Sequence, residues 1–378
     1  MKKRNKGPSC LGSMLLFIAV VLVLKYAYGK LPDNTVDESV SEKGDRLYDM
    51  LLEGLGNYST EIEFGWDCTE ELFDTLERVR GDHPEMFWVS GSGTYKKYTR
   101  GDEVTVKFFA DTDLTLVEIL RCRKEAEKAV DEILAGVNDG WTDYEKLIYI
   151  HDTLVSSTEY DSECAEKVKK QEDCPELWRS SSIYGCLVDH RAICSGYAAA
   201  FQLLAGEMGI DCIRVSGYER ETGSPHEWNC VQLGEKWYYV DVTWDDPRYE
   251  TSDSAFAGSV LYEYFMVTEE VLSLTHVIGE DEAVPICDDD SFGYYRRNGT
   301  YLDEYSFEDA AGIIGSQLSS RMVCLSFGSQ AEAEEAVRDL FENSRFYDIP
   351  ESEALGAVSV VYSVGKTGLL RIAICDPE

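Results

Sequence analysis

The stretch from Cys194 to Asp246 decides how this sequence is interpreted; it reads CSGYAAAFQLLAGEMGIDCIRVSGYERETGSPHEWNCVQLGEKWYYVDVTWDD. Cys194 opens a run of small and apolar residues that predicts a helix ending near Gly209. His226 opens a predicted strand, and Asp241 lies in the strand predicted to follow it. A cysteine, a histidine and an aspartate in this order indicate thiol catalysis, because a base that a carboxylate orients can activate the thiol.

The place of Cys194 at a helix start favours the thiolate. A free thiol has a pKa of about 8.5 and is mostly protonated at neutral pH. Helix N-termini carry unpaired N–H groups and positive potential, which stabilise an anion. The backbone N–H of Cys194 is also a candidate oxyanion donor, together with a second group. Taken alone, one cysteine among twelve at a helix start is more often structural, so the argument depends on the histidine and the aspartate.

The turn between the two strands predicts how the histidine and the aspartate face each other. Strands are predicted at 226–233 and 236–244, and the glycine that leads the turn 234–235 suits a two-residue type II′ turn. With that register, His226 and Asp241 point to the same face as diagonal neighbours. One more loop residue would send Asp241 to the opposite face. The register is therefore a structural test of the hypothesis.

Two aromatic residues are candidates for the oxyanion site or the wall of a substrate pocket. Tyr160 follows a helix predicted at 144–156, and a core tyrosine is an equally good interpretation of it. Trp228 faces the same way as His226, and packing between strands is favoured over ligand binding as its role. The cysteines and histidines do not have the spacing of a zinc site, so the sequence indicates neither a metal nor another cofactor.

The composition is that of a folded and strongly acidic protein. The chain has 378 residues, of which 44% are hydrophobic, and this length is enough for two or three domains. Asp and Glu number 71 against 35 Lys and Arg, which gives a net charge of −36. Such a surface repels phosphates, and the sequence therefore argues against nucleic acid as a partner.

Residues 1–29 predict export. An uncharged, mostly apolar run at 11–24 is short for a membrane-spanning helix, and the residues before Gly29 resemble a cleavage site, so a signal anchor and a removed signal peptide both remain open. Either interpretation places the bulk of the chain outside the cytoplasm, as a single-pass membrane protein with its N-terminus inside or as a secreted protein. Residues 30–43 are polar and are interpreted as a tether. Four cations precede the apolar run: Lys2, Lys3, Arg4 and Lys6.

Two similar regions flank a central domain predicted at 114–279. One spans 44–113 and the other, after a linker at 280–305, spans 306–378; both show the order helix, strand, helix, hairpin. We interpret them as two copies of a small α/β module for scaffolding or substrate presentation, although this order is common enough to recur by chance. The first copy is predicted to have a helix at 45–55, a strand at 60–64, a helix at 69–79 and a hairpin at 94–109. The second is predicted to have a helix at 307–318, a strand at 322–327, a helix at 330–341 and a hairpin at 359–374.

Disulfides are expected if the chain is exported. Apart from Cys194 and the cysteine of the N-terminal segment, ten of the twelve cysteines remain, which is an even number. Cys164 and Cys174 flank a loop rich in Lys and Glu, while Cys212 and Cys230 lie on neighbouring predicted strands. Both are candidate pairs, because spacing does not determine connectivity.

A set of ordered motifs over roughly 141–278 resembles the transglutaminase-like superfamily in its bacterial, exported form. The resemblance implies an α+β, papain-like core in which the cysteine helix packs on an antiparallel sheet. It also places the catalytic residues of the family at Cys194, His226 and Asp241. The segment 189–191 departs from the family pattern, which bears on access to the acyl side. The motifs are IHD at 150–152, YD at 160–161, YGCLV at 184–188, ICSGYA at 193–198, IRVSG at 213–217, HEWN at 226–229, WYYVDVTWDDP at 237–247, YF at 264–265 and His276.

The resemblance implies a thiol enzyme that acts on amide bonds of proteins or peptides through an acyl-enzyme, with a cell-wall or surface protein as a candidate substrate. The superfamily includes crosslinking enzymes, peptidases, amidases and inactive members. Hydrolysis is favoured over crosslinking, because nothing in the sequence marks an amine site. Two alternatives stay open: a non-catalytic binding or scaffolding protein of the cell surface, and a disulfide-rich structural ectodomain. Calcium is not implied, since the acidic run 288–290 lacks the spacing of a calcium loop.

Overall fold

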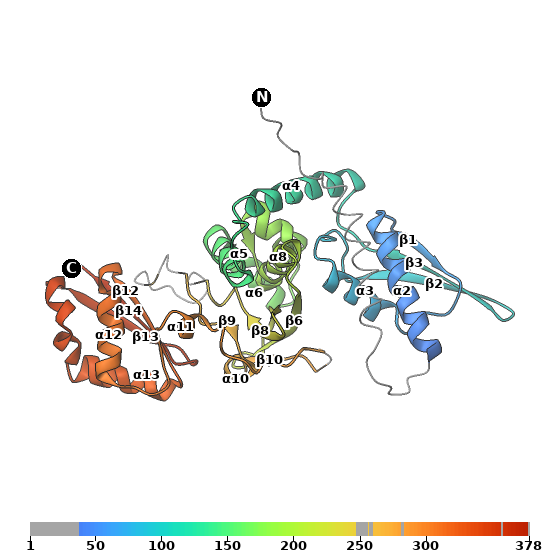
Figure 1. Ribbon diagram of the computed structural model, residues 1–378. Helices are drawn as coiled ribbons and strands as arrows, with labels where there is room; N and C mark the ends of the chain where they lie inside the picture. Colours follow the sequence, from blue (N-terminus) through green and yellow to red (C-terminus); the bar gives the residue numbers. More distant parts are fainter. Residues whose placement is uncertain (1–37, 247–255, 257–259, 281–282, 357, 377–378) are drawn as a thin grey trace, which may run out of the picture.

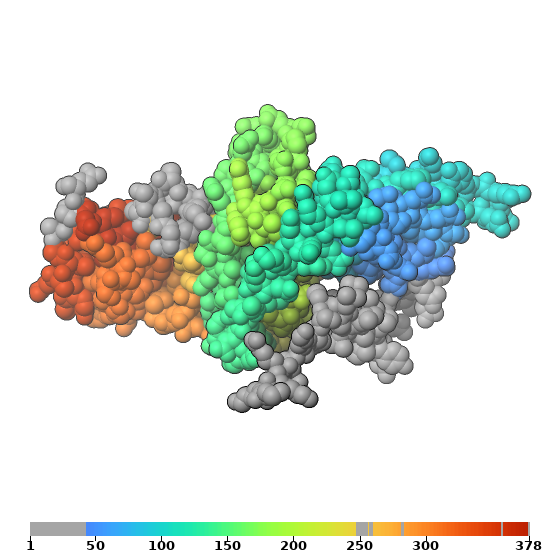
Figure 2. All heavy atoms as spheres, turned by 90° about the horizontal axis from the view of Figure 1, so that it is seen from above, coloured from blue at the N-terminus to red at the C-terminus, as the bar shows by residue number. Residues whose placement is uncertain are grey.

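The computed structural model describes residues 38–246, 256, 260–280, 283–356 and 358–376. Three units follow one another in a row, and the central domain lies between the two smaller modules (Figures 1 and 2). Each unit has its own cluster of buried apolar side chains. The α+β class predicted from the sequence is confirmed.

The central domain is built on a five-stranded sheet in the order β10-β6-β7-β8-β9, in which all neighbouring strands are antiparallel. Helix α8 (Cys194–Glu207) packs on β6 and β7, where the side-chain amide of Asn229 donates a hydrogen bond of 3.0 Å to the backbone oxygen of Ala198. A cysteine helix on an antiparallel sheet is the arrangement that the sequence predicts. The strands are β6 (Cys212–Glu219), β7 (Pro225–Leu233), β8 (Lys236–Val240), β9 (Phe265–Val267) and β10 (His276–Ile278).

The turn between β7 and β8 has the predicted register, but β8 is shorter than predicted. Leu233 pairs with Lys236, and Gly234 has a φ of +65°, as the first position of a type II′ turn requires. The strand ends at Val240 and not at residue 244, so Asp241 lies just beyond it. The cause is local. The carboxylate of Asp241 accepts hydrogen bonds from the backbone N–H groups of Thr243 and Trp244, and this turns the chain away from the sheet.

Two long helices lead into the central domain, α4 (Leu116–Leu134) and α5 (Asp143–Ser157). Each begins with a capping box, in which a threonine and a glutamate satisfy each other's backbone N–H groups. Helix α4 buries Ile119 in the core of the N-terminal module and Ala126 in the core of the central domain. It therefore joins the two units, as its path in Figure 1 shows.

The N-terminal module is a three-stranded antiparallel sheet, in the order β1-β3-β2, with two helices packed on it. The sequence predicts a tether at residues 30–43. Helix α2 begins at Glu38, so the prediction is wrong for residues 38–43. A packed helix extends easily into neighbouring residues, because adding one residue costs much less than starting a helix. The elements are α2 (Glu38–Gly56), β1 (Glu61–Phe64), α3 (Leu72–Asp82), β2 (Gly93–Arg100) and β3 (Glu103–Ala110).

The predicted start of α3 at residue 69 is wrong by three residues. The hydroxyl of Thr69 donates a hydrogen bond of 2.8 Å to Asp67, and the helix begins at Leu72. Threonine and aspartate close a local turn as readily as they cap a helix, because their short side chains reach nearby backbone and side-chain groups.

The C-terminal module has a four-stranded sheet in the order β11-β12-β14-β13. Without β11, its strand order matches that of the N-terminal module: the first strand pairs antiparallel with the last, which pairs with the middle one. Strand β11 pairs with β12, so the last part of the predicted linker 280–305 belongs to the C-terminal module. The elements are α11 (Tyr294–Arg297), β11 (Tyr301–Leu302), α12 (Phe307–Gln317), β12 (Met322–Phe327), α13 (Gln330–Val337), β13 (Ser359–Val364) and β14 (Leu369–Cys375).

Neither candidate cysteine pair is bonded among the described residues, and the strand register also excludes one of them. Cys164 and Cys174 have their Sγ atoms 2.6 Å apart. Cys212 lies opposite Val231, whereas Cys230 lies opposite the next residue of β6, so the two side chains point to opposite faces of the sheet. Cys230 instead has its Sγ 3.4 Å from that of Cys287.

Within the described ranges, no helix has both the length and the apolar character needed to cross a membrane. The expected signal or anchor at 1–29, and the expected tether as far as residue 37, lie outside those ranges.

Candidate active site

Cys194 is held at the N-terminus of α8 by the chain that precedes it. The backbone N–H of Ile193 donates a hydrogen bond of 2.8 Å to the oxygen of Ser180. Gly196 allows this close approach, since a Cβ at that position would come within 2.5 Å of the same oxygen. The side chain of Cys194 is half-buried, and the first N–H groups of the helix lack partners within the helix. A thiol at this place faces the positive end of the helix.

Tyr160 is brought to the cysteine by a short pair of parallel strands, β4 (Glu159–Tyr160) and β5 (Arg191–Ala192). Tyr160 pairs with Ala192, two residues before Cys194. Burial raises the pKa of the Tyr160 phenol, and the negative charges of Cys194 and Asp241 raise it further. The phenol therefore stays protonated, and its role as an oxyanion donor or pocket wall stays a prediction.

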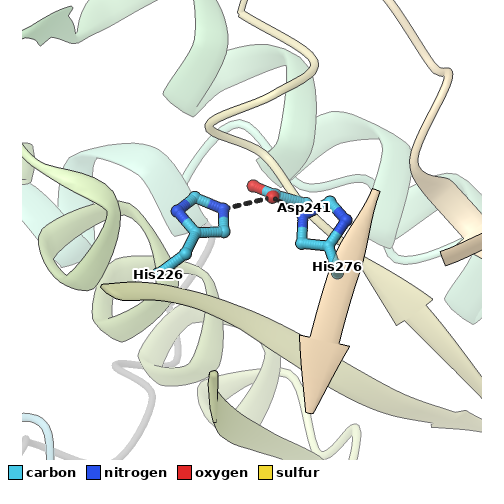
Figure 3. A group of neighbouring side chains, drawn as sticks. All are labelled: His226, Asp241 and His276. Atoms are coloured by element: carbon cyan, nitrogen blue, oxygen red, sulfur yellow. Dashed lines mark hydrogen bonds and ion pairs between the residues drawn. The ribbon is translucent and has the colours of Figure 1, made fainter. Parts of the chain in front are cut away.

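His226 and Asp241 form a buried hydrogen bond. Nε2 of His226 lies 2.6 Å from Oδ2 of Asp241, and their side chains are only 2% and 1% exposed. His226 stands near the start of β7 and Asp241 directly after β8, so the hairpin brings them together. Figure 3 shows that the other ring nitrogen of His226 points away from Asp241. A carboxylate on Nε2 leaves Nδ1 as the nitrogen available to a reaction partner.

The cysteine also affects the charge of the same histidine. Burial alone would lower the pKa of His226, but the charge and hydrogen bond of Asp241, and the hydrogen bond and charge of Cys194, raise it well above its usual value. A raised histidine pKa favours the imidazolium, and an imidazolium favours a thiolate beside it. Of the three residues predicted from the sequence, His226 and Asp241 are joined by a hydrogen bond and Cys194 acts on the pKa of His226, while their catalytic roles stay a prediction.

Asp241 is held by two histidines, and the sequence analysis gave no role to the second. Oδ2 of Asp241 lies 3.0 Å from Nε2 of His276, while Oδ1 accepts backbone N–H groups of Thr243 and Trp244 at 2.9 and 3.1 Å. Burial would raise the pKa of Asp241, but the charge of His226 and the hydrogen bonds from both histidines hold it below its usual range. In the sequence, His276 is only a motif residue near the end of the domain. Its contact with Asp241 forms because β10 pairs with β6, and this pairing is seen only in the structure.

Trp228 lies under the histidine and not at an open pocket. It is 1% exposed, and its ring stacks on that of His226 with centroids 5.9 Å apart. It belongs to the apolar core cluster on this side of the sheet. Its burial therefore supports a packing role. Its contact with His226 restricts the ring of the histidine.

The three side chains in Figure 3 are also a group that could hold a metal ion. Two ring nitrogens and one carboxylate oxygen, from His226, His276 and Asp241, lie within 4.8 Å of one another. The hydrogen bonds of 2.6 and 3.0 Å already use these atoms, and both rings share one oxygen. We therefore interpret the group as a hydrogen-bonded array.

A second buried histidine–aspartate pair links α5 to the segment after β8. Nε2 of His151 lies 3.1 Å from Oδ2 of Asp245, and both side chains are 0% exposed. Nδ1 of His151 contacts Asp152 at 3.1 Å. Both ring nitrogens therefore have carboxylate partners. This is the satisfied polar role that fits a histidine on a helix face.

Comparison with known proteins identifies the class of the central domain. Residues 129–242 match the family model of the transglutaminase-like superfamily. Kyphoscoliosis peptidase of Homo sapiens is 27% identical over 168 residues, which are 41% of this chain and 24% of the relative. Kyphoscoliosis peptidase of Mus musculus is 28% identical over 158 residues, 39% of this chain and 22% of the relative. The chain thus spans about a quarter of the length of these curated relatives.

Among solved structures, a TGase matches with a TM-score of 0.30 and 14% identity, covering 51% of this chain and 52% of that one. The match of residues 129–242 to the family model, and not this solved structure, confirms for this part of the chain the resemblance noted in the sequence: it is a transglutaminase-like domain.

Proposed function

We propose that this protein is a thiol enzyme that acts on amide bonds of proteins or peptides through an acyl-enzyme on Cys194. The observation that carries the proposal is the buried His226, which interacts with Cys194 on one side and with Asp241, at 2.6 Å, on the other. A base between a nucleophile and an orienting carboxylate is the arrangement that covalent acyl transfer uses.

In this mechanism, the thiolate of Cys194 attacks the carbonyl carbon of the substrate amide. The first N–H groups of α8 would hold the oxyanion, and the protonated phenol of Tyr160 is the second donor. His226 gives its proton to the leaving amine as the C–N bond breaks, which leaves a thioester. Asp241 keeps the ring oriented and stabilises the imidazolium. Water, deprotonated by His226, then attacks the thioester and releases a carboxylic acid and the thiol.

We favour hydrolysis over transfer to an amine. The curated relatives carry the name peptidase, which supports this choice. An amine substrate would take the place of water in the last step and form a new amide, so the two outcomes differ only in the acceptor. The substrate that we propose is a protein or peptide, with proteins of the cell wall or cell surface as the first to test.

The test compares wild-type protein with Cys194→Ala on an unfolded protein substrate, in the presence of a fluorescent amine. Fragments that appear only with wild type support a peptidase. Fluorescence incorporated into the substrate only with wild type supports a transferase. If neither product forms, and if iodoacetamide alkylates Cys194 no faster at pH 6 than it alkylates a free peptide thiol, the protein is not a thiol enzyme and the binding or scaffolding alternative stands.

We also propose that the protein is exported and either anchored through the apolar run 11–24 or released after cleavage near residue 29. Two features of the sequence support this: the basic N-terminus and the apolar run that follows it. The test is the mass of the mature protein together with the compartment in which it is found. A full-length chain in the membrane fraction indicates an anchor, a chain lacking about 29 residues indicates a signal peptide, and a full-length chain in the cytoplasm contradicts the proposal.

A further inference from the structure

His276 contacts the orienting carboxylate from the side away from His226. Its Nε2 lies 3.0 Å from Oδ2 of Asp241, the same oxygen that receives Nε2 of His226 at 2.6 Å (Figure 3). The other oxygen receives two backbone N–H groups. The carboxylate therefore has four donors, two on each oxygen, and it is as fully satisfied as a buried carboxylate can be.

Asp241 determines which nitrogen of His276 must carry a proton. A carboxylate only accepts hydrogen bonds, so Nε2 of His276 donates to Asp241. The hydroxyl of Thr275 contacts the other nitrogen: its Oγ1 lies 2.8 Å from Nδ1 of His276, and it donates a hydrogen bond of 3.0 Å to the hydroxyl of Tyr264. Thr275 thus holds the ring of His276 from the Nδ1 side.

His276 is enclosed by aromatic rings and does not reach a substrate. The side chain is 0% exposed. Its ring centroid lies 4.6 Å from that of Trp244, 5.0 Å from that of Trp228 and 5.2 Å from that of Tyr264. A ring so enclosed cannot exchange protons with a reacting group. Any effect that it has on the reaction must pass through the groups of the site that it contacts, which are Asp241 and the ring of His226, whose centroid lies 5.3 Å away.

We propose that His276 is a positioning residue for the thiol reaction: its Nε2–H fixes the shared carboxylate oxygen in line with His226, so that His226 faces Cys194 correctly. This inference rests on the proposed function. Without the second donor, Oδ2 would be held by His226 alone, and the carboxylate could rotate away from the 2.6 Å hydrogen bond. A misplacement of about 1 Å in such a site can cost about 100-fold in rate.

Several other titratable groups face this cluster, so the test must separate their effects from that of His276. They come from every element packed around it: Cys194 on α8, Tyr160 on β4, Glu219 on β6, His226 on β7, Tyr264 before β9 and Asp245 after β8. All of them are unchanged in a His276 variant, and a shift of the pH profile in that variant then reports the loss of one donor.

The experiment measures the rate at which iodoacetamide alkylates Cys194, identified by peptide mass, between pH 4.5 and 9 in the full chain. For wild type we expect a rate at pH 6 close to that at pH 8. His276→Leu removes the donor at similar volume and should lower the rate at pH 6 by about tenfold or more. His276→Gln should restore it to within about threefold, because its amide N–H can replace Nε2–H. His151→Gln, the matched control, should leave the profile unchanged.

The outcomes separate the two proposals. A wild-type profile that follows a free thiol overturns the proposed function itself. A normal wild-type profile that both His276 variants retain overturns the positioning role alone. If His276→Leu does not fold, Thr275→Val decides: it keeps the ring but removes the hydroxyl that holds it at Nδ1, and we expect a loss of about threefold at pH 6. An unchanged profile in Thr275→Val would also contradict the inference. So would a rate in His276→Gln as low as that of a free thiol, because the amide of Gln should replace the lost donor.

Discussion

The central domain contains two buried histidine–aspartate pairs that differ in what lies on the far side of the histidine. His226 contacts Asp241 at 2.6 Å, and His151 contacts Asp245 at 3.1 Å. Both aspartates follow β8, four residues apart, and both histidines are buried. The other nitrogen of His226 points away from Asp241 (Figure 3), and Cys194 contributes to the raised pKa of this histidine, whereas the other nitrogen of His151 lies 3.1 Å from a second carboxylate.

The two carboxylates titrate in opposite directions. Burial raises the pKa of Asp245 to about 6, and the hydrogen bond from His151 offsets this only in part. The pKa of Asp241, equally buried, lies below its usual range because two histidines and two backbone N–H groups stabilise its charge. The comparison teaches that residue type and burial do not determine the charge of such a pair. The number of donors on the carboxylate and the second partner of the histidine do, and under the proposed function they also determine which pair is reactive.

The largest expected effect separates the two histidines. His226→Ala should slow alkylation of Cys194 by iodoacetamide at pH 6 by about 100-fold, because no imidazolium would remain beside the thiol. His151→Ala should leave that rate within about twofold but lower the free energy of unfolding by about 3 kcal/mol, since it leaves a buried carboxylate without its partner. Equal alkylation rates in the two variants would remove the distinction between the pairs.

The two aspartates should differ in the same way in an amide hydrolysis assay. Asp241→Asn keeps the shape but offers His226 a poorer acceptor, and the analogous change in a serine protease costs about 10⁴ in kcat; we expect a loss of about 100-fold or more here. Asp245→Asn should retain activity to within about threefold. Loss of activity in Asp245→Asn at a temperature where the variant is folded would show that the second pair also serves the reaction.

The pH dependence of stability should carry opposite signs for the two carboxylates. The pKa of Asp245 is raised from 3.8 to about 6, so its contribution to stability is fully present below pH 3.8 and is lost as the pH rises through 6. The pKa of Asp241 is lowered, so its contribution is present above pH 3.8 and is lost as the pH falls below that value. Urea unfolding of wild type and of each Asn variant at pH 4, 5, 6 and 7 measures the difference.

Wild type should therefore lose stability relative to Asp245→Asn between pH 4 and pH 7. Relative to Asp241→Asn, it should gain stability or remain constant over the same interval. The same slope for both variants would contradict the assignment of the two carboxylates.

The smallest expected effect tests how the second pair is supported. The hydroxyl of Tyr262 donates a hydrogen bond of 2.9 Å to Asp152, and its ring stacks on His151 with centroids 5.1 Å apart. Tyr262→Phe removes the hydrogen bond and keeps the stacking, so the free energy of unfolding should fall by about 1 kcal/mol. Alkylation of Cys194 should not change. A large change in that rate would mean that the two pairs are coupled.

Local patterns in the sequence were sufficient for much of the fold. The bounds of α4 and β12, and the register at Gly234, follow from apolar periodicity and from the requirements of one turn. Errors arose where side chains act on nearby backbone. Asp241 ends β8 by accepting its own downstream N–H groups, and Thr69 closes a turn where a helix start was predicted.

The part of the site that the sequence did not predict depends on long-range pairing. His226 and Asp241 are 15 positions apart on one hairpin, so turn geometry could relate them. His276 is 35 positions beyond Asp241, on an edge strand whose partner is β6. No local rule specifies which strand an edge strand will join, and the contact could be found only in three dimensions.

The edge position of β10 has a consequence for the order of synthesis. The ribosome delivers the cysteine first and the last donor to the carboxylate, on residues 276–278, much later. Contacts distant in sequence form only after the intervening chain has been made and has closed into a sheet. Under the proposed mechanism, a nascent or half-folded chain therefore lacks the donor from His276, and we expect its thiol to react slowly with the proteins around it. Full reactivity would then require that β10 has joined the sheet.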